Sequence, residues 1–188
     1  MKPIKLAVAA TALAVPAIAQ DTREMDAHVH GVSTVEIAVE HGKVEIKIIS
    51  PGMDIVGFEY EASSAEDKDA VESAIRTMLS PENIVILPEA AECRLTEVLV
   101  QLHGGDLDHD DADAHTDDDH DEPAEAGRHS AFHVSYAFAC EHELELTTIT
   151  FPFFDQFESA QEIEAQYLTE TGSGQAEVGR SAPELTLE

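Results

Sequence analysis

Ten histidines are spread through 188 residues, and several of them stand at spacings suited to metal binding. His28 and His30 form an H-x-H pair directly before a stretch with the periodicity of a β-strand. In an extended chain, residues two apart point the same way, with Cα atoms about 6.6 Å apart. Two such imidazoles can therefore reach one Zn²⁺ ion at about 2.0–2.1 Å. An H-x-H pair on its own is equally compatible with two surface histidines.

A second pair, His129 and His133, stands in a stretch that also has strand character. Residues four apart share a face of a strand, but regular geometry separates them by about 13 Å. We therefore expect one of the two, with His133 favoured, to complete a site with His28 and His30 across a sheet. His129 could then serve a second site. The alternative is that these histidines only solvate an exposed sheet face.

An acidic tract (residues 106–125) carries eleven carboxylates and three histidines, His109, His115 and His120, with no basic residue among them. Such high charge with so little apolar content predicts disorder in the absence of a ligand. Imidazole suits Zn, Cu and Ni, and carboxylates add oxygen donors and neutralising charge. The tract therefore predicts weak, multi-site, rapidly exchanging metal capture. His103, shortly before it, is a further candidate ligand.

The acidic tract has two other interpretations. Asp106-x-Asp108-x-Asp110 begins like a calcium-binding EF-hand loop, but Asp111 stands where that loop needs glycine and Asp117 where it needs glutamate. The tract could also be a solubilising loop without chemistry, as acidic runs commonly are. Interleaved histidines favour metal binding over this alternative.

The charge of the chain restricts its partners. The formal net charge is −29, and it would be −31 without Lys2 and Lys5. Nucleic acid and anionic lipid would both be repelled, whereas cations or a basic protein would be attracted. Neither G-x-S-x-G nor H-E-x-x-H occurs, and we predict no enzymatic activity. A non-catalytic interaction module whose acidic loop docks a basic protein remains an alternative to metal binding.

The N-terminal stretch MKPIKLAVAATALAVPAIAQ has the features of a cleavable signal peptide. We expect residues 1–19 to be removed after Ala19, leaving residues 20–188 as an exported single domain. The apolar run is shorter than the roughly 20 residues that span a bilayer, so we predict no membrane insertion. Cys93 and Cys140 are the two cysteines, and an even number in an exported chain predicts a disulfide, with two buried thiols as the alternative.

The elements that must position these residues are mostly strands. Residues 35–48 alternate as a β-hairpin with its turn at His41-Gly42. Ser64-x-x-Asp67 is a capping box, and the apolar spacing after it predicts a helix that ends before Pro81.

Extended segments are predicted at 50–61, 83–88, 93–103, 129–140, 162–170 and 184–188, with a helical turn within 151–159. Strands 93–103 and 129–140 would form the arms of one long hairpin. These elements predict an α+β fold, in which an antiparallel sheet of hairpins is joined by one or two helices. A long disordered acidic and histidine-rich loop would occupy residues 103–128.

Several stretches together resemble the zinc-regulated periplasmic ZrgA family. They are HVHGVSTVEIAVEHGKVEIKIISPGMDIVGFEY, LPEAAECRL, the His/Asp tract, HSAFHVSYAFAC and FPFFDQFESAQEIEAQYLTETGSGQ, in this order. The resemblance implies zinc binding in the periplasm and a role in zinc uptake, with a zinc importer or its binding protein as partner. It also implies that the histidine-rich loop collects ions.

The chain departs from the family pattern in two places. Tyr60 stands where members often carry histidine after GFE, so the site has either lost a ligand or uses Glu59 instead. The tract is also richer in aspartate and poorer in histidine than the His-Asp tracts of the family. Both changes could weaken zinc affinity or shift the metal preference. Cu²⁺ or Ni²⁺ binding is therefore the alternative to Zn²⁺, and Met25 beside the H-x-H pair hints at copper.

Overall fold

The computed structural model describes residues 29–104 and 129–187. The predicted signal peptide and nearly all of the predicted acidic loop fall outside these residues, as do His28, His109, His115 and His120. Those expectations remain predictions. In the described part, no helix is long and apolar enough to cross a membrane.

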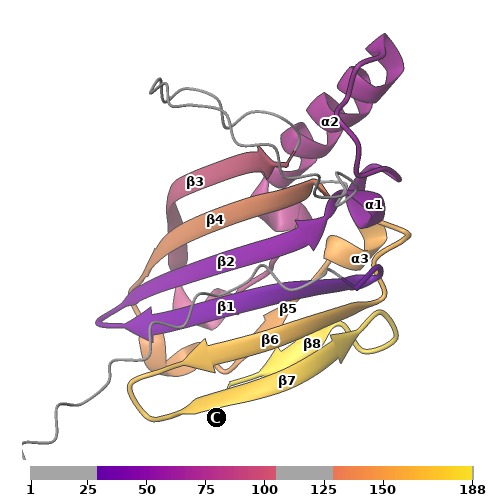
Figure 1. The fold of residues 1–188 in the computed structure, drawn as a ribbon. Coiled ribbons are helices and arrows are strands. Elements are labelled where there is room, and N and C mark those ends of the chain that lie inside the picture. The colour runs from indigo at the N-terminus through magenta and orange to yellow at the C-terminus, as the bar shows by residue number, and fades with distance from the viewer. Residues whose placement is uncertain (1–28, 105–128, 188) are drawn as a thin grey trace, which may run out of the picture.

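A six-stranded sheet forms the centre of the fold, and its strand order is β3-β4-β2-β1-β6-β7 (Figure 1). All neighbouring strands run antiparallel except β1 and β6, which are parallel. The strands are β1 (Val32–Glu40), β2 (Lys43–Pro51), β3 (Cys93–His103), β4 (Ala131–Cys140), β6 (Glu162–Leu168) and β7 (Ser173–Gly179). The predicted α+β class is confirmed, although the sheet is mixed rather than wholly antiparallel.

Smaller elements lie behind one face of this sheet, as Figure 1 shows. Strands β5 (Thr148–Thr150) and β8 (Glu184–Thr186) pair with each other as a separate two-stranded sheet. The helices of the described part are α1 (Gly52–Ile55), α2 (Ala65–Met78) and α3 (Phe153–Gln156), with 3₁₀ turns η1 (Pro81–Asn83), η2 (Glu89–Ala91) and η3 (Glu143–Glu145).

Alternation along the strands decides which face of the sheet is buried. Along most of β1, β2 and β4, every second side chain is apolar and points into the core. Aromatic side chains between Phe151 and Phe157 complete this core. The side chains that point the other way remain at least partly exposed along most of β1 and β2. Burial of the apolar face is the main favourable contribution to folding. The opposite face of the sheet is therefore left to polar side chains.

Several local predictions are confirmed. His41 and Gly42 both have positive φ angles, 52° and 73°, as a tight hairpin turn requires. Ser64 and Asp67 form both hydrogen bonds of the capping box at the start of α2. Cys93 and Cys140 are directly opposite each other in the β3–β4 register and form the predicted disulfide.

Two extended segments were predicted wrongly. Within 50–61, residues Gly52–Ile55 form the single-turn helix α1 rather than a strand. Within 83–88, only Ile86 makes a strand-like contact, an isolated bridge to Thr150. Such short apolar runs are too brief to show a periodicity that would distinguish a strand from a helical turn or an isolated bridge. Strand β7 was not predicted, because the alternation in SGQAEVG is between small and polar residues.

Tyr136 provides a test of how the sheet is joined to helix α2. Its side chain is fully buried, and its hydroxyl donates a 2.6 Å hydrogen bond to the backbone carbonyl of Met78 at the end of α2. Burial raises the pKa of the Tyr136 hydroxyl well above its ordinary value, so it remains a donor at all working pH values. We expect Tyr136→Phe to lower the free energy of unfolding by about 1–3 kcal/mol, because the carbonyl loses its donor.

Urea unfolding followed by circular dichroism measures this change. Tyr60→Phe is the matched control, because Tyr60 is 60% exposed and its hydroxyl lies 3.5 Å from Asp67. The control should stay within about 0.5 kcal/mol of the wild type. Equal stability of Tyr136→Phe and the wild type would contradict the assigned role of this hydrogen bond.

Candidate metal centre

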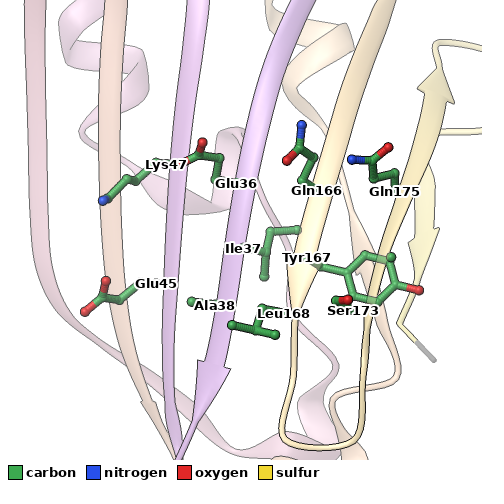
Figure 2. Close-up of a pocket in the computed structure, with 11 residues that line it drawn as sticks. Glu36, Ile37, Ala38, Glu45, Lys47, Gln166, Tyr167, Leu168, Ser173 and Gln175 are labelled. Atoms are coloured by element: carbon green, nitrogen blue, oxygen red, sulfur yellow. The ribbon is translucent and has the colours of Figure 1, made fainter. Parts of the chain in front are cut away.

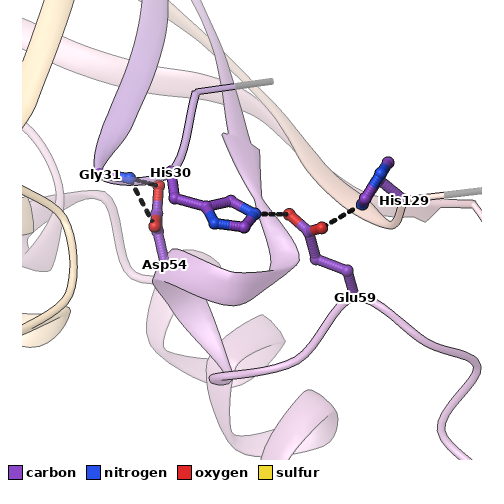
Figure 3. A network of polar contacts seen from close by, with 5 residues as sticks. All are labelled: His30, Gly31, Asp54, Glu59 and His129. Carbon is purple, nitrogen blue, oxygen red and sulfur yellow. Dashed lines mark hydrogen bonds and ion pairs between the residues drawn. The ribbon is translucent and has the colours of Figure 1, made fainter. Parts of the chain in front are cut away.

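A carboxylate lies between two imidazoles at one end of the sheet (Figure 3). His30 Nε2 is 3.3 Å from Glu59 Oε1, and His129 Nδ1 contacts Glu59 Oε2 directly. His30 lies just before β1, Glu59 lies in the segment between α1 and α2, and His129 lies just before β4. Three segments that are far apart in the sequence therefore contribute one side chain each to this His30–Glu59–His129 cluster.

The backbone beside His30 is held by a second carboxylate. Both oxygens of Asp54, on helix α1, accept hydrogen bonds from the amide N–H of Gly31, at 2.8 and 2.9 Å. Gly31 has a φ of +87°, a conformation that favours glycine, so the chain can turn into β1 here. Asp54 is 3% exposed and thus fixes the position of His30 from within the protein.

The other two segments are tied together through Ser130. Its amide N–H donates to the carbonyl of Glu59 at 3.1 Å, and its carbonyl accepts from the amide of Gly52 at 2.7 Å. Gly52 is in close contact with this strand, since a Cβ atom there would lie 2.3 Å from Ser130 Oγ. The positions of Glu59 and of His129, the residue before Ser130, are therefore set by backbone hydrogen bonds.

Burial within the cluster is uneven. Glu59 is 9% exposed, whereas the side chains of His30 and His129 are 56% and 60% exposed. Oε1 of Glu59 is buried and has no hydrogen-bond partner among the described residues, and His30 Nε2 contacts it at 3.3 Å. A buried carboxylate oxygen without a donor is costly unless a cation or proton neutralises it.

The two carboxylates respond differently to their surroundings. Burial acts to raise the pKa of Glu59, but contacts with His129 and His30 outweigh it and hold the pKa below its ordinary value. Burial raises the pKa of Asp54, and the hydrogen bond from Gly31 only partly offsets this. Glu59 is therefore the carboxylate that is kept ionised and available to a cation.

Two imidazole nitrogens and a carboxylate form a donor set of the kind that zinc accepts, at about 2.0–2.2 Å per ligand. Within residues 29–104 and 129–187, no three His, Cys, Asp or Glu side chains are already arranged around a common metal position. His129 contacts the carboxylate directly, so binding would require its imidazole to move back and admit the ion. The cluster thus brings three possible metal ligands together, with the two imidazoles in contact with the carboxylate.

A comparison with protein families bears on the same question. The model of the ZrgA family, described as zinc uptake proteins, matches residues 27–187. The chain belongs to the ZrgA family. No curated protein matches it.

Membership in the ZrgA family connects the chain with zinc. The match spans all three segments of the His30–Glu59–His129 cluster and both cysteines of the disulfide. The family description concerns uptake of an ion and names no reaction. Absence of enzymatic activity stays a prediction.

The remaining predicted ligands that the structure describes are His103 and His133. They lie on β3 and β4, with ring centroids 4.2 Å apart. The structure thus places His129 with His30, and it places His133 beside His103, whereas sequence analysis favoured His133 as the partner of His30. The direction of a side chain at the start of β4 depends on its contact with Glu59, which strand periodicity alone does not reveal.

Tyr60 does not enter the cluster. Its ring stacks on Phe58 with centroids 4.7 Å apart, and its hydroxyl is turned toward Asp67 on α2. The neighbouring residue Glu59 reaches the two imidazoles instead. Asp54 was missed by sequence analysis, because a single aspartate in a segment predicted to be extended gives no signal.

A hollow on the surface of the sheet lies away from this cluster. Figure 2 shows it on the outer face of β1, β2, β6 and β7, with a volume of about 510 Å³. Its lining includes Glu36 and Lys47, which are opposite each other in the β1–β2 register, together with Gln166 and Gln175. It has no histidine or cysteine lining, so its chemistry does not suit zinc.

The lowered pKa of Glu59 leads to a prediction about stability. A carboxyl group whose pKa is lower in the folded state stabilises the fold above its unfolded value, here about 4.5, and this contribution disappears as the pH falls through the folded value. We therefore expect Glu59→Gln to be less stable than the wild type near neutral pH. The difference should shrink as the pH falls below about 4.5.

Urea unfolding at about pH 6.5 and about pH 3.5 measures both differences. Glu61→Gln, at an exposed position two residues away, is the control and should show no such dependence. A stability difference for Glu59→Gln that is the same at both pH values would contradict the assigned interaction.

Proposed function

We propose that this protein captures Zn²⁺ in the periplasm and supports its uptake by delivering it to a zinc importer or to the importer's binding protein. The observation that carries the proposal is the buried carboxylate of Glu59, which lies between two imidazoles and has one oxygen without a hydrogen-bond partner among the described residues. Membership in a family of zinc uptake proteins supports zinc as the ion. Imidazole sites also accept Cu²⁺ and Ni²⁺, which are the alternative ions.

In this proposal, His30, Glu59 and His129 are the zinc ligands. His28 precedes His30 by two residues and could supply a fourth, although it lies outside the described residues. Zinc would neutralise the buried carboxylate and replace its contacts with the two imidazoles. A neutral imidazole and an ionised carboxylate are the forms that a metal requires, and the lowered pKa of Glu59 provides the latter.

The acidic tract would raise the local concentration of cations near the folded site. It joins β3 to β4 in the sequence, and His129 follows it almost immediately. Its histidines and aspartates favour weak and exchangeable binding. The surrounding negative charge would also attract cations and repel anionic polymers.

Two features support an extracytoplasmic location. The first is the disulfide between Cys93 and Cys140, because disulfides persist in oxidising compartments. The second is the sequence pattern of a signal peptide at residues 1–19. We therefore place the working form of the protein in the periplasm, as residues 20–188.

Loss of a single ligand should weaken zinc binding sharply. Changing groups that only support metal ligands typically costs 10–100-fold in affinity. We therefore expect His30→Asn, His129→Asn and Glu59→Gln each to weaken the tight zinc site by at least about tenfold. Titration calorimetry in the presence of a competing chelator measures the affinity.

His41→Asn is the matched control, because His41 is 79% exposed in the β1–β2 turn. A further variant, in which a Gly/Ser linker replaces residues 106–125, should keep one tight site. Loss of all zinc binding in this linker variant, with no effect of the three ligand substitutions, would place binding in the tract and contradict the proposal. Absence of zinc binding in the wild type would favour an acidic module that docks a basic protein.

Acidification should also weaken zinc binding. Protons compete with the metal for imidazole nitrogens, and metal binding releases them. We expect zinc affinity at pH 5 to be markedly lower than at pH 7.5, as measured by the same titration. An affinity that does not change between these two values would contradict ligation by histidine.

A further inference from the structure

Two histidines outside the His30–Glu59–His129 cluster lie side by side on the outer face of the β3–β4 pair. His103 is opposite Ala131 in the register, and Gln101 is opposite His133. Residues directly opposite each other point to the same face, as do residues two apart in one strand. His103 and His133 are thus diagonal neighbours, and their ring centroids are 4.2 Å apart.

This separation is close to what two imidazoles on one metal ion require. With zinc–nitrogen distances of about 2.0–2.1 Å and near-tetrahedral or right-angle geometry, the ring centroids lie roughly 4.5–5 Å apart. Binding would need one nitrogen of each ring to turn toward the shared ion. Both histidines are held on neighbouring, hydrogen-bonded strands, so the pair is positioned by regular structure.

The surroundings offer further donors and access. Gln101, directly opposite His133, carries an amide oxygen on the same face of the sheet. His133 also lines a hollow of about 200 Å³, together with Gln101, Ser135 and Glu36. Metal sites can include water or oxygen ligands in addition to two imidazoles. An ion at this pair would therefore be reachable from solvent.

The pair lies near the His30–Glu59–His129 cluster, but it shares no side chain with it. Gly104, which follows His103, is in close contact with the backbone of His129, since a Cβ atom there would lie 2.5 Å from the His129 carbonyl oxygen. The His129 side chain contacts Glu59, whereas His133 lies beside His103. Two candidate sites therefore lie at the same end of the β3–β4 pair.

We propose that His103 and His133 form a second zinc site, separate from the His30–Glu59–His129 cluster. The two imidazoles of the described strands are one ligand fewer than the three groups of the cluster, and we expect this site to bind zinc more weakly. Its position at the end of β3 and start of β4 would allow ions to be held close to the tighter site. The choice of ion rests on the proposed function, but the location of the site does not.

The test is a titration of the full chain with Zn²⁺, followed by long-range ¹H–¹⁵N spectra of the histidine rings at about pH 7.5. The spectra resolve each imidazole, and single His→Asn variants assign them. We expect ring nitrogens of His30 and His129 to shift first and those of His103 and His133 to shift together at higher zinc. His103→Asn should abolish the shift at His133, and His133→Asn should abolish the shift at His103.

His142→Asn is the control, because His142 is 58% exposed beyond β4 and should leave both responses intact. Amide spectra of each variant would verify that the fold is retained. The inference is overturned if the His133 ring does not respond to zinc, or if it still responds in His103→Asn. A response at His103 and His133 without one at His30 and His129 would instead overturn the proposed cluster and leave the second site standing.

Discussion

The structure around the candidate site depends on the burial of one carboxylate. Glu59 is almost fully covered, yet one of its oxygens has no hydrogen-bond donor in the described part of the chain. Ionised groups in such a position require positive charge or donors nearby. The imidazoles of His30 and His129 contact the Glu59 carboxylate. A divalent cation would add positive charge at the same place. This requirement of the Glu59 carboxylate is the reason we propose zinc binding at the cluster.

The rest of the fold keeps the three side chains within reach of one another. Strands β1, β2 and β4 are adjacent in the sheet, so the residues just before β1 and β4 and just after β2 gather at one end. Asp54 fixes the turn at Gly31, and Ser130 links Glu59 to Gly52 through the backbone. The disulfide joins β3 and β4 at their opposite end. His30, Glu59 and His129 themselves lie in the turns and connecting segments at the ends of these strands, so the hydrogen bonds of Asp54 and Ser130 hold them in place.

Local patterns in the sequence predicted the local structure well. The β1–β2 hairpin, the capped helix α2 and the cysteine pair depend on neighbouring residues or on cysteine number alone. The parallel pairing of β1 with β6 could not be predicted, because nothing in either strand encodes a partner more than a hundred residues away. For the same reason, the roles of His129 and His133 could not be separated by spacing. That choice depends on Glu59, which is brought to His129 by the fold.

Zinc-edge anomalous diffraction from crystals grown with one equivalent of zinc tests the central claim most directly. The account predicts one strong peak at about 2.0–2.2 Å from a nitrogen of His30, a nitrogen of His129 and an oxygen of Glu59. It also predicts that the direct contact between His129 and Glu59 is broken by the ion. A zinc peak elsewhere, with the two imidazoles still in contact with the carboxylate, would contradict it.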